Sequence, residues 1–600
     1  MKRALTLLAA LAATVGAPAA AQSFRDRLPQ DEVIYFLLPD RFENGDPSND
    51  RGGLTGDRLR TGFDPTHKGF YHGGDLKGLI QRLPYIQTLG ATAIWVGPIF
   101  KNKPVQGPRG DESAGYHGYW ITDFTQVDPH LGTNADFKAL VDAAHARGMK
   151  VYMDIIANHT ADVIQYRECQ PAGACLYRSL GDYPYQRRGG VAGAAINGGF
   201  AGDGVTTTAN WARLVDPTYA YTPYVPPAER QVKVPAWLND VRLYHNRGNT
   251  TYENESATYG DFSGLDDLAT ENPRVVRGMI DIFGDWIDRY GVDGFRIDTA
   301  RHVNPEFWQA FVPAMLARAK ARGIPNFHIF GEVSDHDVRP AKLAQHTVVD
   351  RYPAVLDFSF RQAVIETVAG TRGTSAFEQL FNGDAIYANG YATAIQLPTF
   401  ISNHDDGRFA TYVRQAFPNA SQDELLGRTM LGQAMLMTLR GVPTIYSGDE
   451  QGFIGDGNDQ AAREDMFASR TASYNDNRLL GTTKTTATAS FGEYNPLFRE
   501  IAGLARVRLA TPALTRGRQV MRTRGDAPGL LAISRFDPHT GAEVLLAFNT
   551  SARPITGNVQ VEVRSSVWRS LAGPCAARSA APGSVAVSLP AFGYAVCAAN

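Results

Sequence analysis

Short apolar runs recur along the chain, and several of them end directly in clustered ionisable or amide residues. An apolar run of four to eight residues bounded by turn signals is typical of a buried β-strand. The clearest cases are VYMDIIANH (151–159), VDGFRIDTARH (292–302), HIFGEV (328–333) and TFISNHD (399–405). Repeated strands of this kind predict a (β/α)8 barrel, because that fold builds its active site at the carboxyl ends of its strands.

The spacing of apolar positions predicts the other barrel elements. Residues 134–147 and 273–290 carry apolar side chains at helical spacing, and Gly148 is placed to end the first of these helices. We expect the eight barrel strands, in order, at 33–38, 91–100, 150–156, 292–298, 327–332, 355–360, 397–402 and 441–448.

Two stretches depart from this alternation of strands and helices. Residues 160–270 are rich in Gly, Tyr, Pro and Asn, and a connection of that length usually forms a subdomain or a functional loop. After residue 511, short alternating apolar runs separated by turn residues predict an antiparallel β-sandwich, with strands at 530–536, 543–549 and 559–563. The predicted fold is therefore α/β, a (β/α)8 TIM barrel with an insertion after its third strand and a C-terminal β-sandwich. The expected domains are the barrel over 22–159 and 271–510, the insertion over 160–270 and the β-sandwich over 511–600.

The amino-terminal 21 residues have the pattern of an export signal. Lys2 and Arg3 precede an apolar run from Ala4 to Val15, and the small residues of 19–21 suit cleavage before Gln22. The apolar run is too short for a stable bilayer anchor, and no later stretch reads as a transmembrane helix. We expect an exported protein, in the periplasm or the medium.

Composition excludes some partners and leaves others open. The 600 residues have a formal net charge of −2, with 44% hydrophobic and 20% charged residues. Such a balance describes an ordinary globular protein and favours neither nucleic acid nor an anionic membrane as a partner. The oligomeric state stays open, with a monomer slightly favoured.

The four cysteines form two local pairs in the sequence. An oxidising compartment favours pairing, so we expect the disulfides Cys169–Cys175 and Cys575–Cys597. The alternative is four free thiols. A zinc site is disfavoured, because no Cys/His spacing of the structural type is present.

Three carboxylates stand out at the predicted strand ends: Asp298, Glu332 and Asp405. Arg296 lies two positions before Asp298, on the same face of a strand, where it can hold that carboxylate ionised and oriented. Glu332 ends an apolar strand, and an apolar setting raises a carboxyl pKa, as a general acid requires. Such a set suits glycosidic bond cleavage, which needs an acid and a nucleophile facing each other. The alternative is that these three carboxylates are ion-paired at the strand ends and have a structural role only.

These same segments resemble the four signature regions of the α-amylase family of retaining glycoside hydrolases, family 13. Asp154 with Asn158-His159, Gly294 to Asp298 with Arg301-His302, Gly331-Glu332-Val333, and Asn403-His404-Asp405 match in order, and the resemblance covers roughly residues 30–510. It implies that Asp298 is the nucleophile, Glu332 the acid/base and Asp405 the stabiliser of the transition state. It also implies that the insertion is the family's domain B.

The resemblance extends to residues that would bind the sugar. The segment Tyr116-His117-Gly118-Tyr119-Trp120 is similar to a family loop in which Tyr119 would stack under a sugar ring. The alternative is that Tyr119 and Trp120 are simply core residues. Arg301 departs from the family, where Lys is common, and would lie on the acceptor side of the scissile bond. The implied substrate-binding residues are His117, Tyr119, His159, Arg296, Arg301, His302 and His404.

Calcium is the implied cofactor, at two sites. The first resembles a site of cyclodextrin-forming relatives and comprises Asn44, Asp46, Asn49, Asp50, Gly73 and Asp75, whose hard oxygens at close spacing suit Ca²⁺. A metal-free Asx-turn loop is the alternative there. The second would comprise Asn158, Asp267 and the His302 carbonyl, and would tie the insertion to the barrel.

The implied activity is retaining hydrolysis of α-1,4-glucosidic bonds in starch-derived glucans, with an α-glucan as the partner. Cyclomaltodextrinase or neopullulanase action, α-glucosidase action and glucanosyl transfer are rivals within the family. A non-catalytic glucan-binding protein is the rival from another class, since fold does not fix function. The sequence leaves the preferred glucan, endo or exo action and the balance of hydrolysis and transfer open.

Overall fold

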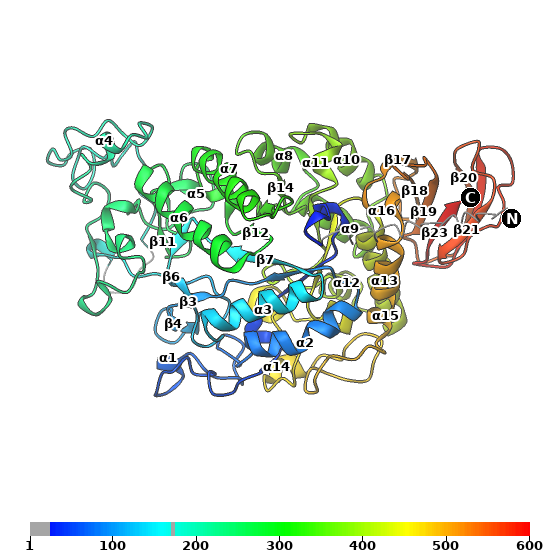
Figure 1. The fold of residues 1–600 in the computed structure, drawn as a ribbon, viewed down its shortest axis with the longest axis horizontal. Coiled ribbons are helices and arrows are strands. Elements are labelled where there is room, and N and C mark those ends of the chain that lie inside the picture. Colours follow the sequence, from blue (N-terminus) through cyan, green and yellow to red (C-terminus); the bar gives the residue numbers. More distant parts are fainter. Residues whose placement is uncertain (1–23, 170–174) are drawn as a thin grey trace, which may run out of the picture.

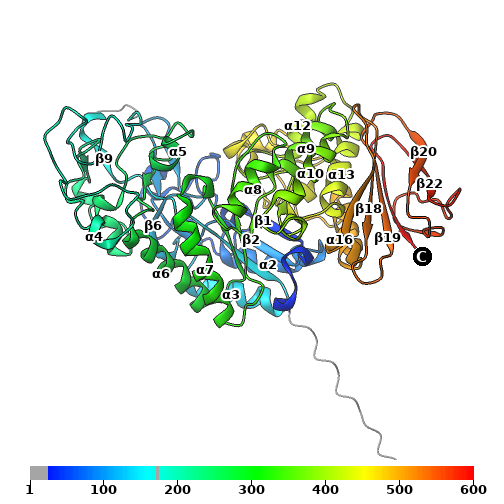
Figure 2. The same ribbon diagram turned by 90° about the horizontal axis from the view of Figure 1, so that it is seen from above.

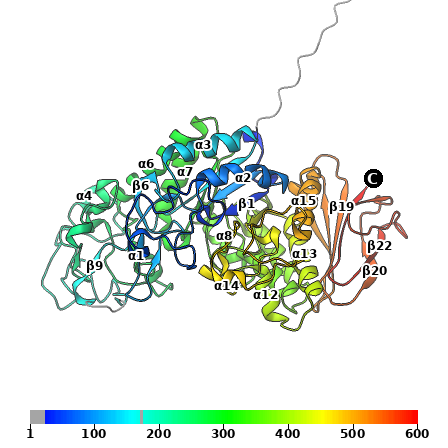
Figure 3. The same ribbon diagram turned by 90° about the horizontal axis from the view of Figure 1, so that it is seen from below.

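The computed structural model describes residues 24–169 and 175–600, so the expected export signal (1–21) lies outside the described residues. The chain forms an elongated molecule with three parts in a row (Figure 1). A barrel lies in the middle, the segment inserted after its third strand at one end and the C-terminal strands at the other. The two end parts lie far apart in the other views as well (Figures 2 and 3). Within the described ranges, no helix is long and apolar enough to cross a membrane.

Eight parallel strands form the barrel, as the sequence predicts. Their order around the sheet is β14-β13-β12-β7-β2-β1-β16-β15. A backbone hydrogen bond of 2.9 Å from Asp357 N to Pro398 O nearly closes the ring between the two end strands. The strands are buried on both faces, which explains why they read as continuous apolar runs. Their bounds are β1 Ile34–Leu37, β2 Ala93–Val96, β7 Lys150–Ile155, β12 Gly294–Ile297, β13 His328–Gly331, β14 Ala354–Val355, β15 Pro398–Thr399 and β16 Val442–Tyr446.

Helices cover the outside of the barrel, and both helices expected from apolar spacing are present. Helix α3 (Asn134–Ala146) begins with a capping box between Thr133 and Asp136. Helix α6 (Pro273–Tyr290) begins at a proline, which suits the first turn, and ends at Gly291 with φ of 69°. The other long helices around the barrel are α2 (Leu76–Thr88), α7 (Pro305–Ala321), α8 (Pro340–Val348), α9 (Phe358–Val368), α12 (Phe409–Ala416), α13 (Gln422–Thr438) and α15 (Pro496–Leu509).

The sixth strand was expected at 355–360, and this prediction is wrong for most of its length. Strand β14 ends at Val355, and helix α9 begins at Phe358. The side chain of Asp357 accepts a hydrogen bond from Phe360 N and caps the helix. An apolar run of this length fits a buried strand or a buried helix face, and here the N-capping aspartate selects the helix.

The inserted segment is made mostly of loops, with short strands and helices. Strand β8 (His159–Thr160) pairs with β11 (Asp266–Asp267), so the start and the end of the segment lie side by side at the rim of the barrel. The Cys169–Cys175 disulfide is present, as predicted. The remaining elements here are β9 (Gln165–Tyr166), β10 (Pro223–Tyr224), α4 (Thr208–Trp211) and α5 (Ser256–Tyr259).

The C-terminal part consists of two packed antiparallel sheets. Apolar residues from both, including Leu545 and Val559, form a core of their own. The expected strands at 530–536 and 543–549 are confirmed, whereas the third occupies 555–560 rather than 559–563. The Cys575–Cys597 disulfide is also confirmed. The larger sheet orders β17 (Arg518–Thr523), β18 (Leu530–Phe536), β19 (Glu543–Asn549), β23 (Tyr594–Ala599) and β21 (Trp568–Ala572), and the smaller pairs β20 (Ile555–Gln560) with β22 (Ser584–Leu589).

Two buried arginines bind the carboxyl end of helix α13, and one of them, Arg535, joins this C-terminal part to the barrel. Arg508 donates to the carbonyls of Met437 and Leu439, and Arg535 of β18 donates to the carbonyl of Thr438. These carbonyls belong to the carboxyl end of helix α13, where backbone acceptors lack partners within the helix and where positive charge is favourable. Both guanidinium groups are fully buried.

Candidate active site

A pocket of about 440 Å³ opens at the carboxyl ends of the barrel strands. The sequence-predicted residues Asp298, Glu332 and Asp405 line it together, although they come from three separate strands. Five of the seven expected substrate-binding residues line it as well, namely His117, Tyr119, His159, Arg301 and His302. Arg296 and His404 lie just behind the wall, in contact with residues that line the pocket.

Arg296 is the centre of the carboxylate cluster. Its Nη1 lies 2.8 Å from Asp154 Oδ1 and 2.8 Å from Asp298 Oδ1, and its Nη2 lies 2.9 Å from Glu332 Oε2. The side chain of Arg296 is 1% exposed, so these contacts are made away from water. One guanidinium therefore fixes the positions of two pocket carboxylates relative to each other.

The electrostatics of the cluster favour retention of a proton. Burial raises the pKa of Asp298 well above its usual range; Arg296 opposes this shift, and the charges of Glu332 and Asp154 reinforce it. Burial likewise raises the pKa of Asp154 to about 6. Because carboxylates in one buried site cannot all ionise easily, the cluster can supply the proton that a general acid must hold. Arg296 was expected to hold Asp298 ionised; it does lower the pKa of Asp298, but burial and the neighbouring carboxylates outweigh it.

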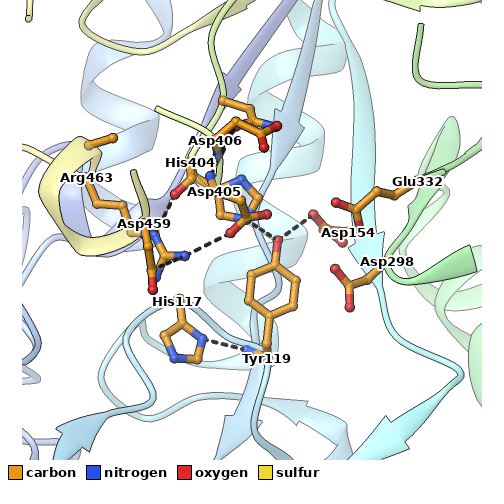
Figure 4. Close-up of polar contacts among 12 residues, drawn as sticks. His117, Tyr119, Asp154, Asp298, Glu332, His404, Asp405, Asp406, Asp459 and Arg463 are labelled. Carbon is orange, nitrogen blue, oxygen red and sulfur yellow. Dashed lines mark hydrogen bonds and ion pairs between the residues drawn. The ribbon is translucent and has the colours of Figure 1, made fainter. Parts of the chain in front are cut away.

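A second group of polar residues forms the opposite wall (Figure 4). The hydroxyl of Tyr119 lies 2.8 Å from His404 Nε2 and 3.2 Å from Asp154 Oδ2. Arg463 Nη2 lies 2.9 Å from Asp405 Oδ1 and 2.6 Å from Asp459 Oδ1. Asp405 thus faces the pocket across from Asp298 and Glu332, and it is held there by an ion pair with Arg463 rather than with Arg296.

The pocket histidines are neutral at neutral pH. Burial lowers the pKa of His159 to about 3 and that of His302 to about 4, and it also lowers the pKa values of His117 and His404. The Nε2 of His159 is buried and has no hydrogen-bond partner among the described residues. A neutral imidazole can donate to one hydroxyl and accept from another, which suits a polyhydroxylated ligand.

Arg301 bridges three segments at the rim of the pocket. Its Nη1 donates to Ser334 O at 3.1 Å, and its Nη2 donates to Tyr252 O at 3.2 Å. Ser334 follows strand β13, whereas Tyr252 belongs to the inserted segment. Arg301 therefore pairs with backbone carbonyls of both walls and joins the inserted segment to the barrel.

Several residues in and behind the wall of the pocket had no assigned role in the sequence analysis. Asp154 was part of a signature segment, but its partners Arg296 and Trp95 are distant in sequence. Asp459 and Arg463 lie on the loop after the eighth strand, in a segment that resembles the closing loop of the family, and this resemblance was the available signal. Glu450, on the same loop, accepts hydrogen bonds from Tyr35 and Tyr85, is fully buried and does not line the pocket.

The residues expected for the first calcium gather at the start of helix α2. The Oδ1 atoms of Asn44 and Asn49 are buried without a hydrogen-bond partner among the described residues. Burial and three neighbouring carboxylates raise the pKa of Asp50 to about 6. Unpartnered oxygens beside crowded carboxylates fit a calcium ion. Gly73 lies against Asn44 and Asp50, and the Asp75 carboxylate caps the helix. The Asp46 carboxylate pairs with Lys77 at 2.6 Å, and the Asp46 carbonyl accepts a hydrogen bond from Asn49 N at 3.1 Å.

The residues expected for the second calcium do not fit the ion. The Asp267 carboxylate lies 2.5 Å from His245 Nδ1, and the other ring nitrogen of His245 lies 2.9 Å from Glu271. The Asp267 carboxylate that was expected to bind the metal is thus paired with His245. The Asn158 carbonyl accepts a hydrogen bond from Leu268 N, next to Asp267. Within the described ranges, the hydrogen bonds of His302 go to Thr299, Ala257 and Arg301, and none joins it to Asn158 or Asp267.

Two sequence comparisons, with a family model and with a curated relative, agree with each other. A family model described as the alpha amylase catalytic domain matches residues 36–517. An α-amylase of Streptomyces lividans is 45% identical over 561 residues, which are 93% of this chain and 60% of that protein. The chain thus spans about three fifths of the length of this curated relative.

Solved structures give the same result. A crystal structure of an Anoxybacillus α-amylase is 26% identical, with a TM-score of 0.67, and the match covers 96% of this chain and 99% of that one. A cyclomaltodextrin glucanotransferase with a three-domain ABC distribution is 27% identical, with a TM-score of 0.68, and the match covers 94% and 99%. The fold, the four signature segments and the matched family model agree, and the chain belongs to the α-amylase family.

Proposed function

We propose that this chain hydrolyses α-1,4-glucosidic bonds of starch-derived glucans with retention of the anomeric configuration. The observation that carries the proposal is the bridge from Arg296 to both Asp298 and Glu332, with Asp405 on the facing wall. Two carboxylates held side by side suit a double displacement, in which one attacks the sugar and the other manages the proton.

In the first step, a carboxylate oxygen of Asp298 attacks the anomeric carbon while Glu332 donates its proton to the glycosidic oxygen. The carbon–oxygen bond to the leaving chain breaks, and a glucosyl ester forms on Asp298. In the second step, Glu332 takes a proton from water, the water oxygen attacks the anomeric carbon, and Asp298 leaves. Asp405, held by Arg463, binds hydroxyls of the distorted sugar ring, and Tyr119 supplies an aromatic face beside it.

We also propose a structural calcium held by Asn44, Asn49, Asp50 and Asp75, with backbone oxygens of Asp46 and Gly73. Bound there, the ion would neutralise the crowded carboxylates and fix the loop at the start of helix α2. We further propose that the protein is exported, and the two disulfides support this, because disulfides persist in oxidising compartments. The proposed domain bounds are 160–270 for the insertion and 511–600 for the C-terminal domain.

The test is a product analysis on starch, maltotriose, pullulan and β-cyclodextrin, with anomeric configuration followed by NMR. We expect α-anomeric products from starch and none from the Glu332→Gln variant. Products of the β-anomer would contradict retention. Formation of new, longer glucans from maltotriose would instead indicate transfer to a sugar, the activity named for the glucanotransferase relatives. Binding of starch without any product would indicate a glucan-binding protein.

A further inference from the structure

The position of the Asp405 carboxylate depends on Arg463, whose Nη2 lies 2.9 Å from Asp405 Oδ1 (Figure 4). The Asp405 side chain is 44% exposed, whereas that of Arg463 is 7% exposed. Arg463 follows a short 3-10 helix (Asp459–Ala462) on the loop after strand β16, so no barrel strand fixes the direction of its side chain. Contacts with other segments must therefore hold the guanidinium in place.

A tyrosine from a distant loop provides such a contact. Arg463 Nη1 donates to the hydroxyl of Tyr116 at 3.2 Å, and Arg463 Nε donates to the His404 carbonyl at 2.9 Å. The carbonyl of His404 adjoins Asp405 in the chain, so this contact cannot fix Asp405 independently. The remaining partner, Asp459, has an exposed side chain, and exposed ion pairs restrain a side chain weakly. Tyr116 thus gives the guanidinium a buried anchor outside its own loop.

Tyr116 is itself held firmly. Its side chain is buried in a small apolar cluster, and it does not line the catalytic pocket. The guanidinium of Arg41 lies over its ring, 3.9 Å from the ring centre, and Arg41 is fixed in turn by an ion pair of 3.1 Å with Asp40. The cluster comprises Phe70, Tyr71, Ala114 and Tyr116.

We propose that Tyr116 is a positioning residue for the reaction, whose hydroxyl orients Arg463 and, through Arg463, the Asp405 carboxylate. The inference rests on the proposed function, in which Asp405 stabilises the transition state. Without the hydroxyl, a buried N–H of Arg463 loses its partner, and the guanidinium turns toward another acceptor because an unpartnered buried donor is costly. Asp405 moves with it, and a displaced carboxylate that acts in the transition state lowers kcat rather than substrate affinity.

The test uses Tyr116→Phe in the full chain, which keeps the ring and removes the hydroxyl. We expect kcat on soluble starch to fall about tenfold and KM to change by less than about twofold. The matched control is Tyr71→Phe, which removes a buried hydroxyl of the same cluster that lies 3.4 Å from Asp128. Its kcat should stay within about twofold of the wild type. An unchanged kcat in Tyr116→Phe, or an equal fall in Tyr71→Phe, would overturn the inference.

A second measurement separates positioning from a loss of folded enzyme. In an Arg463→Ala background, Tyr116→Phe should change kcat by less than about twofold, because the residue through which it acts is gone. A loss of folded enzyme would lower kcat by the same factor in both backgrounds, and that result would overturn the inference. Failure of the proposed function would look different, because Asp405→Asn would then keep its activity on starch whatever the effect of Tyr116→Phe.

Discussion

Arg296 Nη1 lies 2.8 Å from Asp298 Oδ1, and the two residues are two positions apart in the chain. Alternation along a strand puts both side chains on the same face, toward the inside of the barrel. Asp298 therefore reaches the pocket with its orientation already fixed by a buried cation, and little reorganisation is needed when it attacks.

The catalytic assignment predicts severe losses for conservative replacements. Asp298→Asn removes the nucleophile and should lower kcat on the order of 10⁴-fold or more. Glu332→Gln should lower kcat by about 10²- to 10⁴-fold, the usual contribution of a general acid. Steady-state kinetics on soluble starch measures both, with circular dichroism as the control for folding. Retention of a tenth of wild-type activity by either folded variant would refute the assignment.

The pH profile should respond to Asp154. A protonated Asp298 is not a nucleophile, so kcat/KM falls as the pH drops through the pKa of Asp298, which burial and the charge of Asp154 raise. Asp154→Asn removes the negative charge of Asp154, so the pKa of Asp298 should fall and the acid limb of kcat/KM should shift to lower pH by about one unit.

The matched control for this shift is Asp142→Asn, at an exposed position on helix α3. The acid limb of that variant should coincide with that of the wild type. A limb that stays in place in Asp154→Asn, or that moves to higher pH, would mean that Asp154 does not influence the titration of Asp298.

Calcium removal should destabilise the protein. Binding to the native state alone stabilises it by about 2.7 kcal/mol at a free ligand concentration one hundred times Kd. We expect a chelator to lower the Tm by roughly 2–5 °C, measured by scanning calorimetry. Asp50→Ala should lose this difference, whereas Asp142→Ala should keep it. Equal chelator effects on Asp50→Ala and the wild type would exclude this loop as the site.

Arg301 should influence the products of the reaction. Its hydrogen bonds to Ser334 O and Tyr252 O together require a branched guanidinium, and a lysine can keep only one of the two. Arg301→Lys should change product lengths or the ratio of hydrolysis to transfer by about threefold, with a smaller effect on an aryl maltoside that has no acceptor-side sugar. A loss of rate on the aryl maltoside as large as on starch, with unchanged products, would indicate a purely structural residue.

The sequence contained enough information for the barrel and for the three carboxylates. Parallel strands end at the same rim, so Asp298, Glu332 and Asp405 could be expected together from their strand-end positions alone. The disulfides followed from local spacing. Capping glycines and prolines at helix ends were similarly readable, as at Pro273 and Gly291.

Contacts between distant loops could not be predicted. The pairing of Asp405 with Arg463 depends on how two loops after neighbouring strands fold back, and no local pattern encodes it. The His245–Asp267 contact arises within a segment of little periodicity, so no local pattern encodes it. A metal was expected there because Asn158, Asp267 and His302 lie in segments that resemble the family. The sixth strand was misread because an apolar run fits both a strand and a buried helix face until its cap is recognised.

The two arginines at the carboxyl end of helix α13 have a consequence for engineering. Arg535 belongs to the C-terminal sheet, yet one of its hydrogen bonds is made to a barrel helix, in a place closed to water. Truncating the chain before β18 would remove Arg535 from that helix end and leave Arg508 as its remaining bound cation. Minimal catalytic fragments of this protein should therefore keep the terminal sheets, and fusion partners are better attached beyond them than in their place.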